Sequence, residues 1–169
     1  IVRDTGNTNI KFFGNNWLIQ NNEVSNPAIE DGIHFSGGGH VVSRNYIHDI
    51  NAPAPSHTDA IQVSCGHHSI VEYNLIENSR SSVIMQDCLD ATQLDRNDGM
   101  IYRYNLIYLT QDFSQYTNAS IRMQMYHSVG MKIYNNVFAF NGTSPVQAIR
   151  VQDKSPSHPS TAEVYNNIF

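Results

Sequence analysis

The sequence predicts an all-β repeat protein in which short strands coil into parallel stacks, and three observations predict it. One phrase of alternating apolar residues around an asparagine recurs, as in IVEYNLI around Asn74 and MIYRYNLI around Asn105. A second alternating phrase, centred on Ile, also recurs in each period. Val, Ile, Tyr and Phe fill the periodic positions and Lys is scarce, which favours strands over helices. The recurring asparagines are Asn22, Asn45, Asn74, Asn105, Asn136 and Asn167, which lie 23, 29, 31, 31 and 31 residues apart.

Each period contains three short strand-like segments. The first is centred on Ile, the second leads into the asparagine, and the third follows it. Strands with no helix between them cannot form βαβ units, but they can form one turn of a strand helix whose like strands stack about 4.8 Å apart. The Ile-centred segments are DGIHF (31–35), DAIQV (59–63), SVIMQ (82–86), ASIRMQ (119–124) and QAIRVQ (147–152).

This pattern resembles the right-handed parallel β-helix, or pectin-lyase-like, superfamily with PbH1-type repeats, over essentially the whole chain. The resemblance implies a right-handed solenoid of about six coils with three strands per coil, PB1, PB2 and PB3. It also implies an Asn ladder in the turn between the second and third strands. Asn suits that turn because it tolerates left-handed backbone geometry and its amide can hydrogen-bond from coil to coil. We expect residues 1–169 to form a single β-helix domain that is a piece of a longer β-helix protein.

Composition excludes several classes of partner. The 169 residues carry a formal net charge of −5 and no basic run, which argues against nucleic-acid binding. No stretch approaches the roughly 18 apolar residues of a membrane span. Open solenoid ends are suited to end-to-end stacking with further coils or another chain.

The two cysteines fall in one column when the Ile-centred segments are aligned. Cys65 lies four residues after Ile61, and Cys88 lies four after Ile84. Stacked neighbouring strands bring Cα atoms within disulfide range, so we expect either a disulfide or two stacked thiols. A disulfide would place the protein in an oxidising compartment, outside the cell or on its surface. The alignment uses Ile33, Ile61, Ile84, Ile121 and Ile149.

Alternation predicts which PB1 residues face outward. The residues that directly follow the aligned Ile residues form one outward-facing column, and the residues two positions further along form a second. Asp31 and Asp59 lie two residues before their Ile, at the mouth of the groove. Rows of His, Gln, Arg and Asp suit an extended polysaccharide, because Arg binds carboxylates bidentately. The predicted columns are His34, Gln62, Met85, Arg122 and Arg150, then Ser36, Ser64, Asp87, Gln124 and Gln152.

The resemblance places the functional site on PB1 and implies a polysaccharide lyase acting on an acidic, uronate-containing polymer by β-elimination. Arg122 and Arg150 would neutralise the uronate carboxylate. His34, His57, His127 or one of the arginines would remove the C5 proton, and Asp59 would take part in catalysis. A Ca²⁺ ion held by Asp59 and Asp87 is an alternative neutralising group, since carboxylate oxygens suit it. The predicted substrate-binding residues are Gln62, Gln124, Gln152, His57 and His127.

Two further functions stay open. HTDAIQ (57–62) resembles the Asn-Thr-Asp-Gly phrase of polygalacturonase-type glycoside hydrolases, and IRVQDK (149–154) resembles their Arg-x-Lys element. Their acid–base pair is incomplete here, because MQDC offers Asp87 alone and YHSVG replaces Gly-His-Gly. The third function is a non-catalytic, glycan-binding or structural module of a fibre, adhesin or tailspike.

Overall fold

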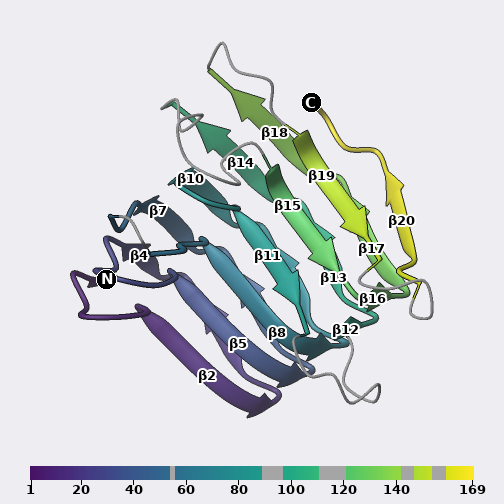
Figure 1. The fold of residues 1–169 in the computed structure, drawn as a ribbon, viewed down its shortest axis with the longest axis horizontal. Helices are drawn as coiled ribbons and strands as arrows, with labels where there is room; N and C mark the ends of the chain where they lie inside the picture. The colour runs from purple at the N-terminus through teal and green to yellow at the C-terminus, as the bar shows by residue number, and fades with distance from the viewer. Residues whose placement is uncertain (54–55, 89–96, 111–120, 142–146, 154–158) are drawn as a thin grey trace.

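The computed structural model describes residues 1–53, 56–88, 97–110, 121–141, 147–153 and 159–169. These residues contain strands and no helix, so the predicted all-β class is confirmed for them. Three parallel sheets are formed, and their strands stack in register as in a parallel β-helix of about six coils. Figure 1 shows the strands of each coil lying beside the equivalent strands of the next, from the N-terminal to the C-terminal end.

We name the three sheets PB1, PB2 and PB3 by their order within a coil. PB1 comprises β2 (Ile10–Asn15), β5 (Ile33–Gly38), β8 (Ile61–His67), β11 (Ile84–Asp87), β15 (Ile121–Tyr126) and β19 (Gln147–Gln152). PB2 comprises β3 (Leu18–Gln20), β6 (Val41–Ser43), β9 (Ile70–Glu72), β13 (Ile101–Arg103), β17 (Met131–Tyr134) and β20 (Ala162–Tyr165). PB3 comprises β1 (Val2–Arg3), β4 (Glu23–Ser25), β7 (Tyr46–Ile50), β10 (Leu75–Ser79), β14 (Leu106–Leu109) and β18 (Val137–Phe140).

Two short strands extend PB1 beyond its C-terminal edge. They are β12 (Asn97–Asp98) and β16 (Ser128–Val129), and they pair with each other. Asp98 also pairs with His67 at the end of β8.

Apolar side chains from all three sheets fill the interior. On PB1, the strand alternation turns Ile33, Ile61 and Ile84 inward, and all three are fully buried. Each such side chain contributes roughly 1.5–3 kcal/mol by leaving water, so stacking apolar residues stabilises every coil through its neighbours. One polar exception is Gln86, which is buried and bonded to the Ser128 hydroxyl at 2.6 Å and to the Tyr102 hydroxyl.

Asparagine amides run along the turn between PB2 and PB3. The backbone N–H of Asn74 donates to Oδ1 of Asn105 at 3.1 Å, and its side-chain Nδ2 donates to the same oxygen at 3.0 Å. The same pair of bonds links Asn105 to Asn136, and it repeats from Asn22 to Asn167. The residue before each asparagine has a left-handed backbone, with φ between 53° and 58°.

The disulfide Cys65–Cys88 joins β8 to the residue after β11, with the Cα atoms 4.5 Å apart. Because Asp87 pairs with Ser64, the two cysteines occupy equivalent positions of neighbouring coils.

The alignment of PB1 strands predicted from the sequence is wrong by two residues at β15. Ile84 pairs with Met123 rather than with Ile121, and Met123 in turn pairs with Ile149. The outward column therefore contains Gln124 where Arg122 was expected, between Met85 and Arg150. A slip of two residues preserves the inside–outside alternation of a strand, so the local pattern could not reveal it.

Candidate functional site

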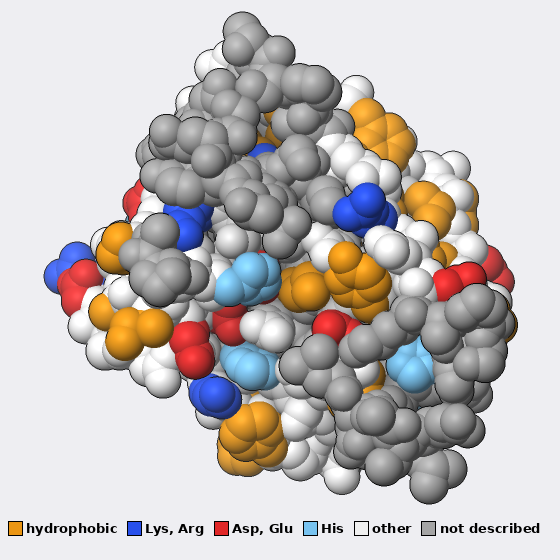
Figure 2. Space-filling model, viewed as in Figure 1, with side chains coloured by type: hydrophobic (Ala, Val, Ile, Leu, Met, Phe, Trp, Pro, Cys, Tyr) orange, Lys and Arg blue, Asp and Glu red, His pale blue; other side chains and the backbone are white. Residues whose placement is uncertain are grey.

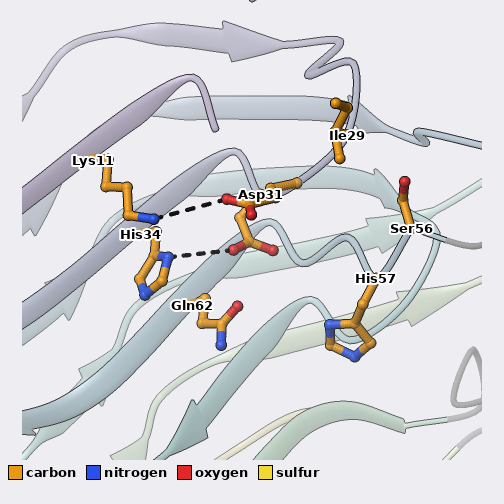
Figure 3. Close-up of a pocket in the computed structure, with 8 residues that line it drawn as sticks. Lys11, Ile29, Asp31, His34, Ser56, His57 and Gln62 are labelled. Carbon is orange, nitrogen blue, oxygen red and sulfur yellow. Dashed lines mark ion pairs between the residues drawn. The ribbon is translucent and has the colours of Figure 1, made fainter. Parts of the chain in front are cut away.

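A polar cavity opens on PB1 over the first three coils. Its volume is about 380 Å³, and it lies over β2, β5 and β8 and the loops that lead into β5 and β8. Figure 2 shows histidine, acidic and basic side chains gathered on this part of the face. The residues that line it are Lys11, Ile29, Glu30, Asp31, His34, Ser56, His57 and Gln62 (Figure 3).

Strand register brings three of these side chains into one row. Lys11 on β2 pairs with His34 on β5, and His34 pairs with Gln62 on β8. Each residue follows an inward-facing Ile, so alternation turns the three side chains toward the cavity. The row therefore presents a cation, an imidazole and an amide at successive coils.

The loops before β5 and β8 place two aspartates at equivalent positions. The backbone N–H of Asp59 donates to Oδ1 of Asp31 at 2.9 Å, and the N–H of Gly32 donates to the Asp59 carbonyl at 3.0 Å. Gly32 is required at this contact, because an added Cβ would lie 2.8 Å from the carbonyl oxygen of Ala60. The close packing of these two loops holds the aspartates together.

His57 completes a cluster with the two aspartates. One ligand-type atom from each of Asp31, His57 and Asp59 lies within 4.8 Å of the others. Nδ1 of His57 lies 3.2 Å from Oδ2 of Asp59. The side chain of His57 is 45% exposed, whereas that of Asp59 is fully buried, so the cluster has one open side.

Burial dominates the electrostatics of the two carboxyl groups. It raises the pKa of Asp31 to about 8, and the neighbouring Asp59 carboxylate adds to the rise. Burial also raises the pKa of Asp59, although His57 opposes that change. The close contact with Asp59 in turn raises the pKa of His57. The pair therefore favours a bound proton or another positive charge beside it.

His34 sits differently from His57. Its Nε2 lies 3.0 Å from the Ser64 hydroxyl, and its Nδ1 lies 3.7 Å from Oδ2 of Asp31. Burial lowers the pKa of His34, and the positive charge of Lys11 lowers it further. Nζ of Lys11 itself lies 3.8 Å from a carboxylate oxygen of Glu30.

The structure brings together four of the residues predicted from the sequence. His34, His57 and Gln62 line the cavity, and Asp59 lies beneath it against His57. The site draws on adjacent coils, as expected for a PB1 face.

Arg122 does not lie on the exposed surface where the sequence placed it. It is 3% exposed, and its Nη1 donates to the carbonyls of Ser79 and Ser81 at 3.4 and 3.3 Å. Burial lowers its pKa to about 10. Arg122 is the second residue of β15, and its side chain reaches the turn that follows β10 of PB3. The guanidinium thus bonds the backbone of a neighbouring coil.

The remaining predicted residues lie on other coils. Arg150 and Gln124 pair with each other on β19 and β15, and Gln152 pairs with Tyr126 further along the same strands. Gln124 is buried and donates to the Tyr126 hydroxyl. His127 is buried just after β15, and none of the four lines the cavity. Lys154, which belongs to the Arg-x-Lys resemblance, lies outside the described residues.

The expected Ca²⁺ ligands Asp59 and Asp87 do not share a site. Asp87 pairs with Ser64, which is five residues along the chain from Asp59. At about 3.3 Å per residue, that separation is about 16 Å, too far for one ion whose ligands lie at about 2.3–2.6 Å. These two carboxylates therefore do not fit the expected calcium site.

Two residues of the site were not given a role by the sequence reasoning. Lys11 belongs to the first coil, where IKFFGN aligns with IHFSGG, so extending the Ile register to Ile10 would have found it. Asp31 was placed at the groove, but its contact with the Asp59 loop depends on a close approach at Gly32 that alternation alone does not predict.

Fold and site together define a parallel β-solenoid with a histidine–aspartate cavity on one sheet. Searches against family models, curated proteins and solved structures found no match for the chain. Among the described residues, no helix has the length and apolar character needed to cross a membrane.

Proposed function

We propose that the protein is a secreted, right-handed β-helix of the pectin-lyase-like kind that cleaves a uronate-containing polysaccharide by β-elimination in the PB1 cavity. The observation that carries the proposal is the convergence of Lys11, His34 and His57 on one polar cavity above a parallel sheet. Lys11 and His57 offer positive charge to an acidic polymer, next to the acidic Glu30 and Asp31 that also line the cavity. The Cys65–Cys88 disulfide fits an oxidising location outside the cell.

His34 is the proposed base. Its imidazole lines the cavity, with Nε2 3.0 Å from the Ser64 hydroxyl and Nδ1 3.7 Å from Asp31, which is beyond hydrogen-bond distance. In the reaction, His34 takes the C5 proton of the uronate, and the C5–H electron pair forms the C4=C5 double bond. The C4–O glycosidic bond breaks, and the departing oxygen takes a proton from His57 or water. A general base must lie within hydrogen-bond reach of the proton that it removes, and the position of His34 in the cavity wall supports that role.

Lys11 and His57 are the proposed partners of the substrate carboxylate. Proton removal from C5 places negative charge next to that carboxylate, so a cation beside it stabilises the transition state. Lys11 lies one coil before His34, and His57 lies beside the buried Asp59. Gln62, one coil further on, offers an amide for sugar hydroxyls.

The test measures elimination on a panel of uronate polysaccharides with wild-type protein, His34→Ala and Arg150→Ala. The unsaturated product is detected by its ultraviolet absorbance, and new reducing ends are counted in parallel. We expect turnover by the wild type and by Arg150→Ala, and a loss of at least about 100-fold in His34→Ala, in line with general-base contributions. Full activity in a folded His34→Ala variant would refute the assignment of the base.

Glycoside hydrolysis is a second candidate, favoured by the Asp31–Asp59 pair. Hydrolysis needs two carboxyl groups near the scissile bond, and these two lie on adjacent coils with oxygens within 4.8 Å. Asp31 lines the cavity but is only 2% exposed, and Asp59 lies beneath it at 0% exposure, so the pair is poorly placed to contact a substrate and this function ranks second. New reducing ends without an unsaturated product would favour hydrolysis. If neither reducing ends nor unsaturated product formed, the result would favour glycan binding without cleavage.

A further inference from the structure

We propose that Asp31, His57 and Asp59 form a binding site for a divalent ion of the zinc and first-row transition-metal class. The site lies at the floor of the cavity and draws on two loops, those before β5 and β8. Metal binding at these residues does not depend on the proposed lyase activity.

The spacing of the three side chains suits one ion. Their ligand-type atoms all lie within 4.8 Å of one another, and Nδ1 of His57 lies 3.2 Å from Oδ2 of Asp59. Zinc bonds to imidazole nitrogen and carboxylate oxygen are about 2.0–2.2 Å long, so neighbouring ligand atoms around it lie about 3–3.5 Å apart. Small side-chain rotations of Asp31 would complete the set.

A second observation, independent of this clustering, points to a missing positive ligand. Asp59 is fully buried, and neither of its carboxylate oxygens accepts a hydrogen bond of good geometry among the described residues. Nδ1 of His57 lies 3.2 Å away, and His57 and the Ser82 backbone only partly oppose the effect of burial, which still raises the pKa of Asp59. Buried polar atoms in proteins are almost always partnered, and a buried charge is paired or bound to a metal. A cation between Asp59 and Asp31 would satisfy these oxygens and relieve the repulsion between the two carboxylates.

The ligand types select the class of ion. Ca²⁺ and Mg²⁺ prefer oxygen ligands and larger or fully octahedral oxygen shells, whereas imidazole suits Zn²⁺, Cu²⁺, Ni²⁺ and Fe²⁺. Three protein ligands leave a coordination position open, as in catalytic zinc sites. The exposed side of His57 shows that this open position would face the cavity.

One consequence rests on the proposed function. If a uronate binds in the cavity, the open coordination position would accept its carboxylate oxygen. A His57 that binds the ion is neutral, so the ion would replace the charge of His57 beside Lys11, and water would protonate the departing oxygen. His34 lies 3.7 Å from Asp31 and is not among the three ligands, so it would remain available as the base.

The test is calorimetric titration of chelator-treated protein with Zn²⁺, Mn²⁺ and Ca²⁺ in separate runs, without polysaccharide. We expect one equivalent of Zn²⁺ per chain, weaker Mn²⁺ binding in line with the general affinity order, and still weaker Ca²⁺ binding. His57→Ala should weaken Zn²⁺ binding by more than about 10-fold, since loss even of an outer-shell partner costs about that much. Asp59→Asn should do the same.

His48→Ala is the matched control. His48 also lies near two carboxylates, 2.8 Å from Asp49 and 3.5 Å from Glu23, but both of those acids are well exposed. This variant should bind Zn²⁺ as the wild type does. Circular dichroism checks folding, and His57→Ala keeps the test decisive if Asp59→Asn unfolds, because His57 is half-exposed.

Three results would overturn the proposal. They are no Zn²⁺ or Mn²⁺ binding by the wild type, equal binding by folded His57→Ala, or tighter binding of Ca²⁺ than of Zn²⁺. Because no substrate is present, these results are separate from the lyase assay. A protein that binds Zn²⁺ but cleaves no polymer would refute the proposed function and leave the metal site standing.

Discussion

Replacing one internal member of the asparagine ladder should destabilise the protein far more than replacing its first member. Asn105 is 2% exposed, and its side chain makes four hydrogen bonds. Its Nδ2 donates to the Val71 carbonyl and to Oδ1 of Asn136, each at 3.0 Å. Its Oδ1 accepts the backbone and side-chain N–H groups of Asn74 at 3.1 and 3.0 Å.

In Asn105→Ala, the Asn74 backbone N–H and the Val71 carbonyl lose partners in a buried turn. Each unsatisfied buried group costs about 1–3 kcal/mol, so we expect a loss of roughly 3–5 kcal/mol in the free energy of unfolding. Asn22 begins the ladder, and its half-buried side chain donates to Gln20 and Asn45. Among the described residues, no group donates to the side-chain oxygen of Asn22, so Asn22→Ala should cost about 1 kcal/mol or less.

Urea unfolding followed by circular dichroism measures both variants against the wild type. Equal destabilisation by the two substitutions would refute the reasoning, because the difference depends on the bonds that only an internal member accepts. A loss below about 1 kcal/mol in Asn105→Ala would refute it as well.

Three further predictions follow from single features of the structure. Replacing Cys65 and Cys88 by Ser should lower the free energy of unfolding by about 3 kcal/mol, because the disulfide closes a 23-residue separation; an unchanged urea midpoint would contradict this. Arg122→Ala should lower thermal stability and leave the turnover of folded molecules intact, since the guanidinium bonds backbone carbonyls; a folded variant without turnover would show a direct role. With a chelator present to remove metal ions, the contribution of Asp31 to the free energy of unfolding should fall as the pH rises from about 4 to about 8. Its folded-state pKa of about 8 lies above the unfolded value of 3.8, so the native state binds the proton more tightly, and Asp31→Asn should flatten the melting temperature against pH. If the melting temperature of Asp31→Asn fell with pH as steeply as that of the wild type, the pH dependence would belong to the other titratable groups that face Asp31. Those groups are Asp59, His57, His34 and Glu30.

The repeat made the fold readable from the sequence because stacking imposes the same requirement on every coil. An asparagine in the PB2–PB3 turn must bond the asparagines above and below it, so the residue recurs at the coil period. The same reasoning places Cys65 and Cys88 in one column. Structural features that repeat in every coil can therefore be predicted from the spacing of residues in the sequence.

The candidate site was predicted only in part because its chemistry lies where the repeat is broken. His57 comes from the loop before β8, and no periodic pattern fixes how that loop folds back against Asp59. At β15, both Ile121 and Met123 fit the apolar alternation, and only pairing with Ile84 decides between them. The local sequence predicts which side chains of a strand face the interior, whereas the register of the strand depends on its pairing with the neighbouring coil.

The stacked aspartates contrast with the stacked asparagines in a way that bears on function. An amide offers both a donor and an acceptor, so a column of asparagines satisfies itself from coil to coil. Two ionised carboxylates offer only acceptors, and Asp31 and Asp59 occupy equivalent positions of adjacent coils with oxygens within 4.8 Å. Such a pair is stable only with a positive species between or beside its members, whether a proton or a metal ion. His57 lies at the open side of the pair, so a proton and a metal ion would compete for the aspartates at the floor of the proposed substrate cavity.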